Sequence, residues 1–412
     1  MKHIKQVFGG NLQQYTMALA LILLVVIFNI TTDGKMLTSS NLQSLISGYA
    51  YVLVLAIGMV MVIVVGHIDL SVGSVAAFVG MSVAISIRDW GLPWWGGLLL
   101  GLVVGALVGA WHGFWLAKMG IPGFITTLAG MMIFRGLVIW MSHSISVPVP
   151  REFQIFGAGY LPEWGPAFTG MNNSTLLLGI LAAAWFIYSE LRRRRSLLAR
   201  NHEAPLWASL TRIALIVIVI GYITQLFASG RPGTSFPIPG LILVGLVIIY
   251  HIITQRTRLG RHIYAVGGNK AAAALSGVSV PKVYFFVMMN MSFLAAVAGI
   301  LFIGRATSAG PTDGTMWELD AIAAVFIGGA AVSGGIGTVV GSMIGGLVMA
   351  VLNNGLILMG VGADQTQVIK GLVLLAAVAF DVRNKIAGKP SLVGQIARRF
   401  SRDKVEAAAT TD

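Results

Sequence analysis

The chain has 412 residues, of which 56% are hydrophobic and only 10% are charged, and its mean hydropathy is +0.84. Soluble domains contain about 25% charged residues, so this composition excludes a soluble globular protein and indicates an all-α polytopic membrane protein. The chain contains no cysteine, which excludes disulfides, thiol catalysis and cysteine-based metal sites. The net charge of +13 would suit a nucleic-acid partner, but the positions of the basic residues along the chain explain it without one.

Apolar segments predict about ten to twelve membrane-spanning helices, each close to the ~20 residues that a bilayer core requires. The predicted spans cover residues 15–30, 49–65, 71–87, 96–117, 124–141, 174–188, 212–228, 241–253, 284–303, 319–332, 338–358 and 364–380. The short segments around Val75 and Leu319 could instead be re-entrant. The first span resembles a signal peptide, but no small-x-small cleavage site follows it, so we expect an uncleaved helix.

Basic residues give the predicted orientation, because cytoplasmic loops of membrane proteins carry an excess of lysine and arginine. With the N-terminus inside, most of the 28 basic residues fall on cytoplasmic segments, among them Arg192 to Arg195. The predicted parts are a cytoplasmic N-terminus (1–14), a membrane domain (15–381) with cytoplasmic loops near 189–211 and 254–283 and a periplasmic loop near 142–172, and a cytoplasmic tail (382–412). This bias also explains the net positive charge.

The stretch from Gly66 to Gly80 interrupts the apolar pattern, because it carries His67, Asp69, Ser71 and Ser74. A charge at membrane depth costs at least about 2.5 kcal/mol unless it is paired or meets water. We predict a helix that breaks inside the bilayer, with Asp69 capping the next helix at its positive end. These residues are candidates for a translocation pathway, since such backbone must be buried in protein or line a water-filled cavity. Alternatively, Asp69 and Ser71 are caps that never meet a substrate, and His67 is a buried, hydrogen-bonded histidine.

Other polar residues within the spans are candidates for the same pathway or for contacts between helices. Asn353 and Asn354 either line the pathway or join helices by hydrogen bonds. Arg135 either faces a partner or a cavity, or extends to the membrane interface. Glu318 and Asp320 belong either to a helix N-terminus, where acids complement the dipole, or to an outer loop or gate.

Glycines repeat every four residues in two regions, which places them on one helix face where another backbone can approach closely. They are Gly101, Gly105, Gly109 and Gly113 in the first region, and Gly337, Gly341 and Gly345 in the second. In addition, the two stretches around Asp69 and Asp320 suggest an internal duplication, although their sequences match poorly.

The hydrophilic loop near 254–283 contains the sequence RTRLGRHIYAVGGNKAAAALSGVSVPKVY. Asn269 suits a helix N-cap, the alanine-rich segment from Lys270 to Ser276 favours a helix, and Gly277 is a natural helix stop. The pattern predicts a short helix outside the membrane, between two spans. Such an element can dock on a soluble partner and pass rigid motion into the membrane.

Three stretches of the chain have a specific family pattern. They are GHIDLSVGS at 66–74, GRHIYAVGGNKAAAALSGV at 260–278 and GRATSAGPTDGTMWELDAIAAVFIGGAAVSGGIGT at 304–338, with LNNGL at 352–356 in addition. Together they resemble permease subunits of bacterial ABC monosaccharide importers, in the ribose, xylose, arabinose and galactose branch. Two features look more like the xylose or multiple-monosaccharide permeases than the shorter ribose type. They are the GHIDLSVGS sequence with His67, and the extra pair of spans around the loop with Arg192 to Arg195.

The resemblance implies a permease subunit that translocates xylose or a related monosaccharide across the bacterial inner membrane. It implies three partners: a cytoplasmic ATPase subunit, a periplasmic sugar-binding protein and a second permease copy, giving a homodimer. By the same resemblance, the coupling helix that docks on the ATPase comprises Gly268, Asn269, Lys270, Ala271, Ala272 and Gly277. Related permeases usually begin this helix with an acidic residue, whereas Lys270 and Ala271 stand there in this chain.

The chain lacks the motifs of an enzyme. No GxxxxGK[ST] phosphate loop is present, so we expect the partner subunit to use ATP and this chain to hold no cofactor. No HExxH or other close histidine pair is present, so we expect no metal site. The competing hypothesis is an ion-coupled secondary sugar transporter, in which Asp69, Asp320 and Arg135 would form an ion relay. A polytopic enzyme is a third, weaker hypothesis.

Overall fold

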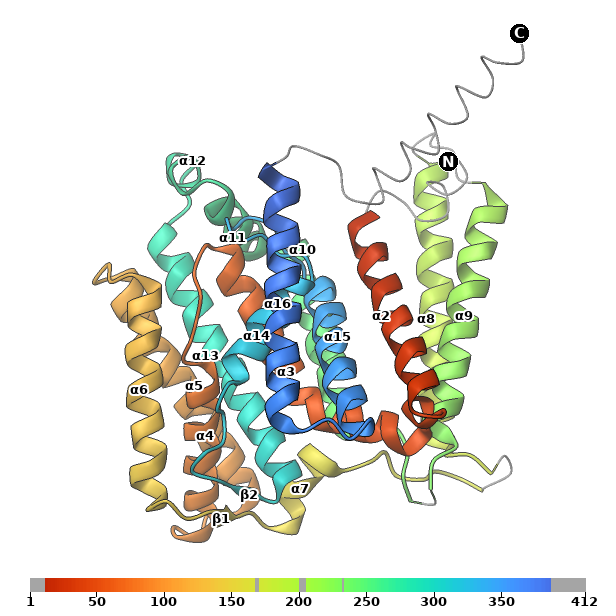
Figure 1. The fold of residues 1–412 in the computed structure, drawn as a ribbon. Helices are drawn as coiled ribbons and strands as arrows, with labels where there is room; N and C mark the ends of the chain where they lie inside the picture. The colour runs from red at the N-terminus through yellow and green to blue at the C-terminus, as the bar shows by residue number, and fades with distance from the viewer. Residues whose placement is uncertain (1–11, 167–169, 200–204, 232, 387–412) are drawn as a thin grey trace.

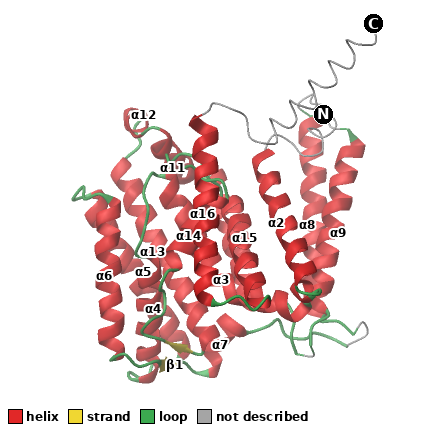
Figure 2. Ribbon diagram, in the orientation of Figure 1, coloured by secondary structure: helices red, strands yellow, loops and turns green. Residues whose placement is uncertain are grey.

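The computed structural model describes residues 12–386, except 167–169, 200–204 and 232. Most of these residues are helical (Figures 1 and 2), which confirms the predicted all-α class. Eight helices in this part are long and apolar enough to cross a membrane: α3 (Ser39–Val64), α5 (Trp94–Ala117), α6 (Gly123–Ser142), α8 (Asn173–Leu198), α9 (Leu206–Ala228), α10 (Ile238–Arg256), α13 (Val280–Ala306) and α15 (Val339–Leu358).

Four further helices cover the remaining predicted spans, so every predicted span overlaps a helix. They are α2 (Leu12–Thr31), α4 (Val72–Arg88), α14 (Trp317–Ile327) and α16 (Ala363–Ile386). With 11 residues, α14 extends only about 16 Å, roughly half of a bilayer core. The expectation of a full span at 319–332 is therefore wrong, and the re-entrant alternative describes this segment.

The helices run between two opposite faces of the molecule (Figure 1). One face carries α11 (Arg258–Gly268) and α12 (Lys270–Leu275), and we call it the α12 face. The opposite face, the α7 face, carries α7 (Arg151–Ala158) and the antiparallel pair β1 (Val147–Pro148) and β2 (Ser308–Ala309).

The α7 face is built from short connecting elements. The segment near 142–172, predicted to be a surface loop and not a span, contains β1 and α7. The 3₁₀ turn η1 (Lys35–Leu37) joins α2 to α3. No other strand is present in the part of the chain that the structure describes.

The centre of the protein is formed by α3, α4 and α13. Every residue from Val52 to Val65 is buried. This stretch is apolar on all sides, as expected for a helix surrounded by other helices. The hairpin of α8 and α9, by contrast, lies at the edge of the molecule and leaves large apolar side chains exposed (Figure 1). Its position fits a surface that faces lipid.

Glycines in α5 bring its backbone directly against α13. A Cβ atom added at Gly109 would lie 2.5 Å from Cα of Met289, and one added at Gly113 would lie 3.0 Å from the carbonyl oxygen of Phe285. Side chains larger than hydrogen would separate the two helices. The predicted close approach is confirmed, and in the second series Gly341 and Gly345 make the same kind of contact between α15 and the end of α14. Gly337 does not share this helix face, because it precedes α15 and meets side chains instead.

Two sets of four helices, α3–α6 and α13–α16, repeat one arrangement in opposite directions. In each set a long buried helix ends at one face, a non-helical segment re-enters the protein, and a shorter helix follows, which is α4 or α14. The packing is paired as well, because α13 contacts α4 and α5 as α3 contacts α14 and α15. This inverted pair supports the predicted internal duplication, with residues 65–71 and 307–316 as the matching breaks.

Candidate functional site

The beginnings of α4 and α14 meet inside the protein. A Cβ atom added at Gly73 would lie 2.2 Å from the carbonyl oxygen of Gly314, and one added at Gly314 would lie 2.0 Å from the carbonyl oxygen of Gly73. Gly73 is the second residue of α4 and Gly314 lies three residues before α14, so the positive ends of the two helix dipoles lie close together at this point. Converging half-helix ends within a membrane domain are typical of transporter sites.

Asp69 lies in the first break, and its side chain is fully buried. Its Oδ1 atom accepts a hydrogen bond from the backbone N–H of Ser71 at 2.8 Å and another from the Ser71 hydroxyl at 2.6 Å. Ser71 itself occupies the N-cap position of α4, and its hydroxyl makes no capping bond. The prediction that Asp69 caps this helix is therefore wrong in detail: Asp69 fixes the residue that precedes the helix.

Glu318 lies in the first turn of α14 and reaches the beginning of α4. It is only 8% exposed, and its Oε2 atom lies 2.6 Å from the position that a Cβ of Gly73 would occupy. Among the described residues, Glu318 Oε2, Asp69 Oδ2 and Ser74 Oγ are buried without hydrogen-bond partners. The interpretation of Glu318 as an outer loop or gate residue does not fit this interior position. The alternative interpretation, in which Glu318 belongs to a helix N-terminus, agrees with its place in the first turn of α14.

His67 lies where the first break leaves the α12 face. Its ring packs edge-on against Tyr284 of α13, with 4.6 Å between centroids. Lys270, the first residue of α12, lies over the same Tyr284 ring, with Nζ 5.5 Å from the centroid. His67 is half-buried and its Nε2 has no partner in the described part of the chain. The histidine therefore contributes to a link between the break and α12. The alternative of a buried, hydrogen-bonded histidine is only partly met, because Nε2 has no hydrogen-bond partner among the described residues.

Arg135 of α6 contacts the second break. Its guanidinium donates a hydrogen bond to the carbonyl oxygen of Asp313. Asp313 in turn accepts a bond from the backbone N–H of Gly310 at 2.7 Å. The prediction that an arginine within a span faces a partner is confirmed, and each break is thus held by a polar contact.

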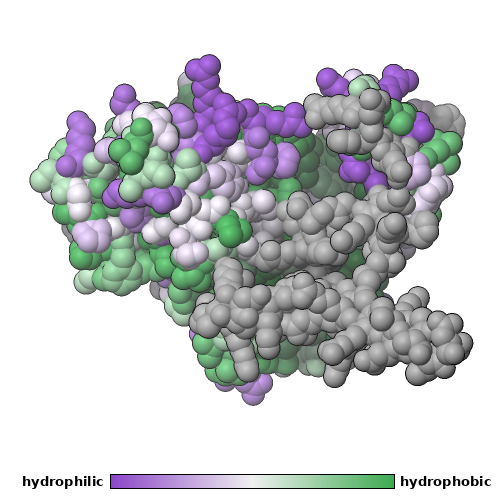
Figure 3. All heavy atoms as spheres, turned by 90° about the horizontal axis from the view of Figure 1, so that it is seen from above, coloured by the Kyte–Doolittle hydropathy of each residue, from purple (hydrophilic) through white to green (hydrophobic). Residues whose placement is uncertain are grey.

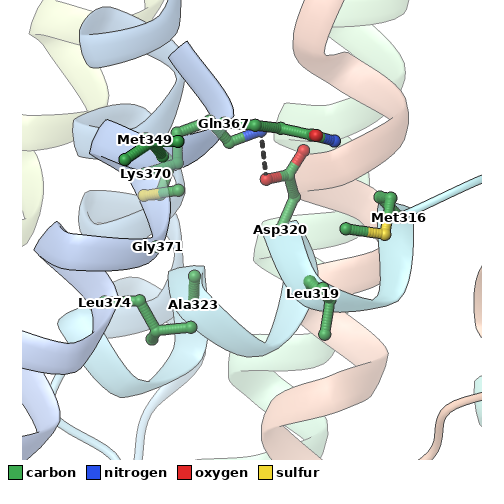
Figure 4. Close-up of a pocket in the computed structure, with 10 residues that line it drawn as sticks. Met316, Leu319, Asp320, Ala323, Met349, Gln367, Lys370, Gly371 and Leu374 are labelled. Atoms are coloured by element: carbon green, nitrogen blue, oxygen red, sulfur yellow. Dashed lines mark ion pairs between the residues drawn. The ribbon is translucent and has the colours of Figure 1, made fainter. Parts of the chain in front are cut away.

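Asp320 points away from Glu318, although the two residues are close in sequence. Its carboxylate forms an ion pair with Lys370 of α16, with 2.5 Å between Oδ1 and Nζ. The pair lies in a groove of about 320 Å³ (Figure 4), lined by Met316, Leu319, Asp320, Ala323, Met349, Gln367, Val368, Lys370, Gly371 and Leu374. Sequence reasoning missed Lys370 as a site residue. Its signal was a lysine inside an apolar span, which requires an acidic partner.

Asn353 and Asn354 of α15 bind the beginning of α3. Asn353 donates to the hydroxyl of Tyr49, and the side chains of Asn354 and Asn41 exchange two hydrogen bonds of 3.0 and 3.1 Å. The alternative in which these asparagines join helices is confirmed. They belong to a different place from Asp69, so the six predicted pathway residues do not form one site.

The short helix predicted in the basic loop is α12, and its caps are as expected. Asn269 Oδ1 accepts a hydrogen bond from the N–H of Ala272 at 3.0 Å, and Gly277 ends the segment with φ at +83°. Ala271 also lies in α12, whereas Gly268 ends a separate helix, α11. Sequence reasoning missed α11 because its glycines and charges hide an apolar face, which includes Ile263.

The described residues contain no group of three or more histidine, aspartate or glutamate side chains that could hold a metal ion. Asp69 and Arg135 are instead bonded to the two breaks, and Asp320 is paired with Lys370 between helices. Together with the inverted repeat, the converging half-helices and the helical loop on one face, they define a membrane-transport permease.

The chain belongs to the family described as branched-chain amino acid transport system / permease component, which matches residues 41–378. It is 36% identical to the xylose transport system permease protein XylH of Haemophilus influenzae over 91% of this chain and 97% of that protein. It is 33% identical to the ribose import permease protein RbsC of Bacillus subtilis, over 91% of this chain and 94% of that protein. No solved structure matches it.

Proposed function

We propose that this chain is the permease subunit of an ATP-driven importer that carries xylose or a related monosaccharide across the bacterial inner membrane. A separate cytoplasmic ATPase powers the cycle, and a periplasmic sugar-binding protein delivers the substrate. Similarity to xylose and ribose permeases supports the sugar class. The single structural observation that carries the proposal is α12, a capped helix projecting from one face of a chain without a phosphate-binding loop.

The α12 face is the cytoplasmic side in this proposal, with both chain termini on the same side. Hydrophilic side chains gather on this face (Figure 3). Exposed basic residues at the end of α10 and in α11 include Arg256, Arg258 and Arg261. An excess of basic residues marks cytoplasmic loops, which supports this orientation. The α7 face then receives the binding protein.

A second copy of the chain covers the groove between α14 and α16 in this proposal. The Asp320 and Lys370 side chains are each 19% exposed there. Charged groups facing lipid are costly, so this surface has to meet protein or water. Apolar side chains around the groove, among them Val368 and Leu372, are more than half exposed and suit contact with another copy. The translocation pathway then runs between the two copies, beside the ion pair.

Purification of the tagged chain from its native membrane in mild detergent tests the proposal, with the companions identified by mass spectrometry. Recovery of an ATPase subunit in near-equal amount is the expected result. Sugar accumulation by the purified chain alone in vesicles with an ion gradient, abolished by an uncoupler, would instead establish the secondary-transporter alternative.

Leu275 is expected to anchor α12 in the ATPase. It is 91% exposed, an unusual position for a leucine outside the membrane, and a buried leucine contributes about 1.5–3 kcal/mol. Leu275→Asp should therefore reduce ATPase recovery with the permease at least tenfold, whereas Leu275→Met should retain it. The ratio of the two subunits after gel filtration is the measurement. Equal recovery with the aspartate variant would remove Leu275 from the docking surface.

A further inference from the structure

Three backbone segments meet at the end of α11. The N–H of Gly335 donates a hydrogen bond to the carbonyl oxygen of Val64 at 2.8 Å. A Cβ atom added at Gly267 would lie 1.7 Å from that same oxygen, and 2.8 Å from the nitrogen of Gly335. A Cβ added at Gly335 would lie 2.9 Å from Cα of Gly268. The three segments touch through main-chain atoms, with no side chain between them.

Tyr264 adds a polar contact to this meeting point. Its hydroxyl donates a hydrogen bond of 2.6 Å to the carbonyl oxygen of Gly337. Burial raises the pKa of the Tyr264 phenol, so the group stays protonated and remains a donor at neutral pH. Gly337 in turn lies against Val60 and Val64 of α3. The side chain of Tyr264 thus ties α11 to the segment that follows α14.

The three segments lead to different halves of the inverted repeat. Val64 is the last residue of α3 and precedes the break that leads into α4. Gly335 and Gly337 lie between α14 and α15, in the segment by which α14 returns to the α12 face. Gly267 and Tyr264 belong to α11, and only Asn269 separates α11 from α12. One element outside the membrane-spanning helices therefore touches the connections of both half-helices.

We propose that Tyr264 and Gly267 form a coupling junction, through which displacement of α12 moves the connections of α4 and α14 together. The inference rests on the proposed function, because it assumes that an ATPase displaces α12. Close-packed backbone has low compressibility and transmits displacement, whereas a flexible side chain in between would absorb it. Tyr264 and Gly267 are positioning residues in this scheme and need not touch the sugar.

The test uses the complete importer, with ATPase and binding protein, in proteoliposomes. Tyr264→Phe removes the hydroxyl, and Gly267→Ala places a methyl group against Val64. Three quantities are measured: assembly of the complex, sugar-stimulated ATP hydrolysis and sugar uptake. Tyr264→Phe should assemble and hydrolyse ATP, but consume about fivefold more ATP per sugar, the factor that corresponds to ~1 kcal/mol for one hydrogen bond. Gly267→Ala should raise this ratio at least tenfold.

Matched controls are Tyr222→Phe in α9, a residue that is 51% exposed, and Gly245→Ala in α10, where an added Cβ meets nothing within 4 Å. Both should keep the wild-type ratio of ATP to sugar. An unchanged ratio of ATP to sugar in Tyr264→Phe would overturn the junction. If Gly267→Ala does not assemble, the result for Tyr264→Phe alone is the test. Uptake by the wild-type permease without its ATPase would refute the proposed function itself.

Discussion

Alanine in place of Gly73 or Gly314 is expected to prevent the permease from reaching its native fold. The added methyl group would lie 2.2 Å or 2.0 Å from a carbonyl oxygen of the facing backbone, and at Gly73 it would also meet Glu318 Oε2 at 2.6 Å. Main chain cannot move aside as a side-chain end can, so we expect a loss of about 3 kcal/mol or more. The measurement is the yield of monodisperse protein and its thermal stability in detergent.

Two other glycines serve as controls that separate the cost of backbone strain from the cost of the clash with the facing main chain. Gly360 has φ at +79°, close to the +75° of Gly314, but an added Cβ there meets nothing within 4 Å. Gly360→Ala should therefore cost only the backbone strain, about 1–2 kcal/mol. Gly136→Ala in α6, with an ordinary helical backbone and open space, should cost nothing measurable. If Gly314→Ala were no less stable than Gly360→Ala, the segment before α14 would not be in direct backbone contact with α4.

Local composition predicted the helices well, because each helix that crosses the bilayer needs a long apolar segment. It also predicted the first break, since Asp69 cannot stay within a regular lipid-facing helix. It did not predict the length of α14. Residues 319–332 are apolar enough for a span, but the helix ends at Ile327, because Gly328 and Gly329 follow and Gly329 takes a left-handed backbone with φ at +87°. Apolar composition therefore predicts that a segment is buried in the membrane domain, but not how far it crosses.

The candidate site was harder to predict, because its residues are separated widely along the chain. Nothing in the sequence around Gly73 indicates that it meets Gly314. Similarly, Glu318 and Asp320 differ by two positions, yet one reaches the start of α4 and the other pairs with Lys370. Residues two apart on a helix face different directions, so two acids in one turn can serve two places. Their partners follow only from the packing of α14 against α4 and α16.

Breaking the ion pair between Asp320 and Lys370 is expected to destabilise the permease strongly. The two side chains are largely buried, each 19% exposed, and their charged atoms lie 2.5 Å apart. Asp320→Leu would leave the lysine charge without its partner, and Lys370→Met would leave the carboxylate without its partner. Removing one member of a buried pair typically costs about 3–5 kcal/mol, because the remaining charge stays desolvated. Thermal stability of the purified protein, measured for each single variant, is the readout.

The double variant with Asp320→Leu and Lys370→Met distinguishes a buried pair from a hydrated one. If protein covers the groove, the double variant should recover most of the stability, because two apolar side chains replace two charges that had to be desolvated. If water fills the groove, the single variants should lose less than about 1 kcal/mol, as exposed pairs do, and the double variant should have little to restore. Strong single effects with recovery in the double variant would therefore support the groove between α14 and α16 as a surface covered by protein, and would favour a second permease copy as its partner. Weak single effects would contradict that interface and leave the ion pair in contact with water.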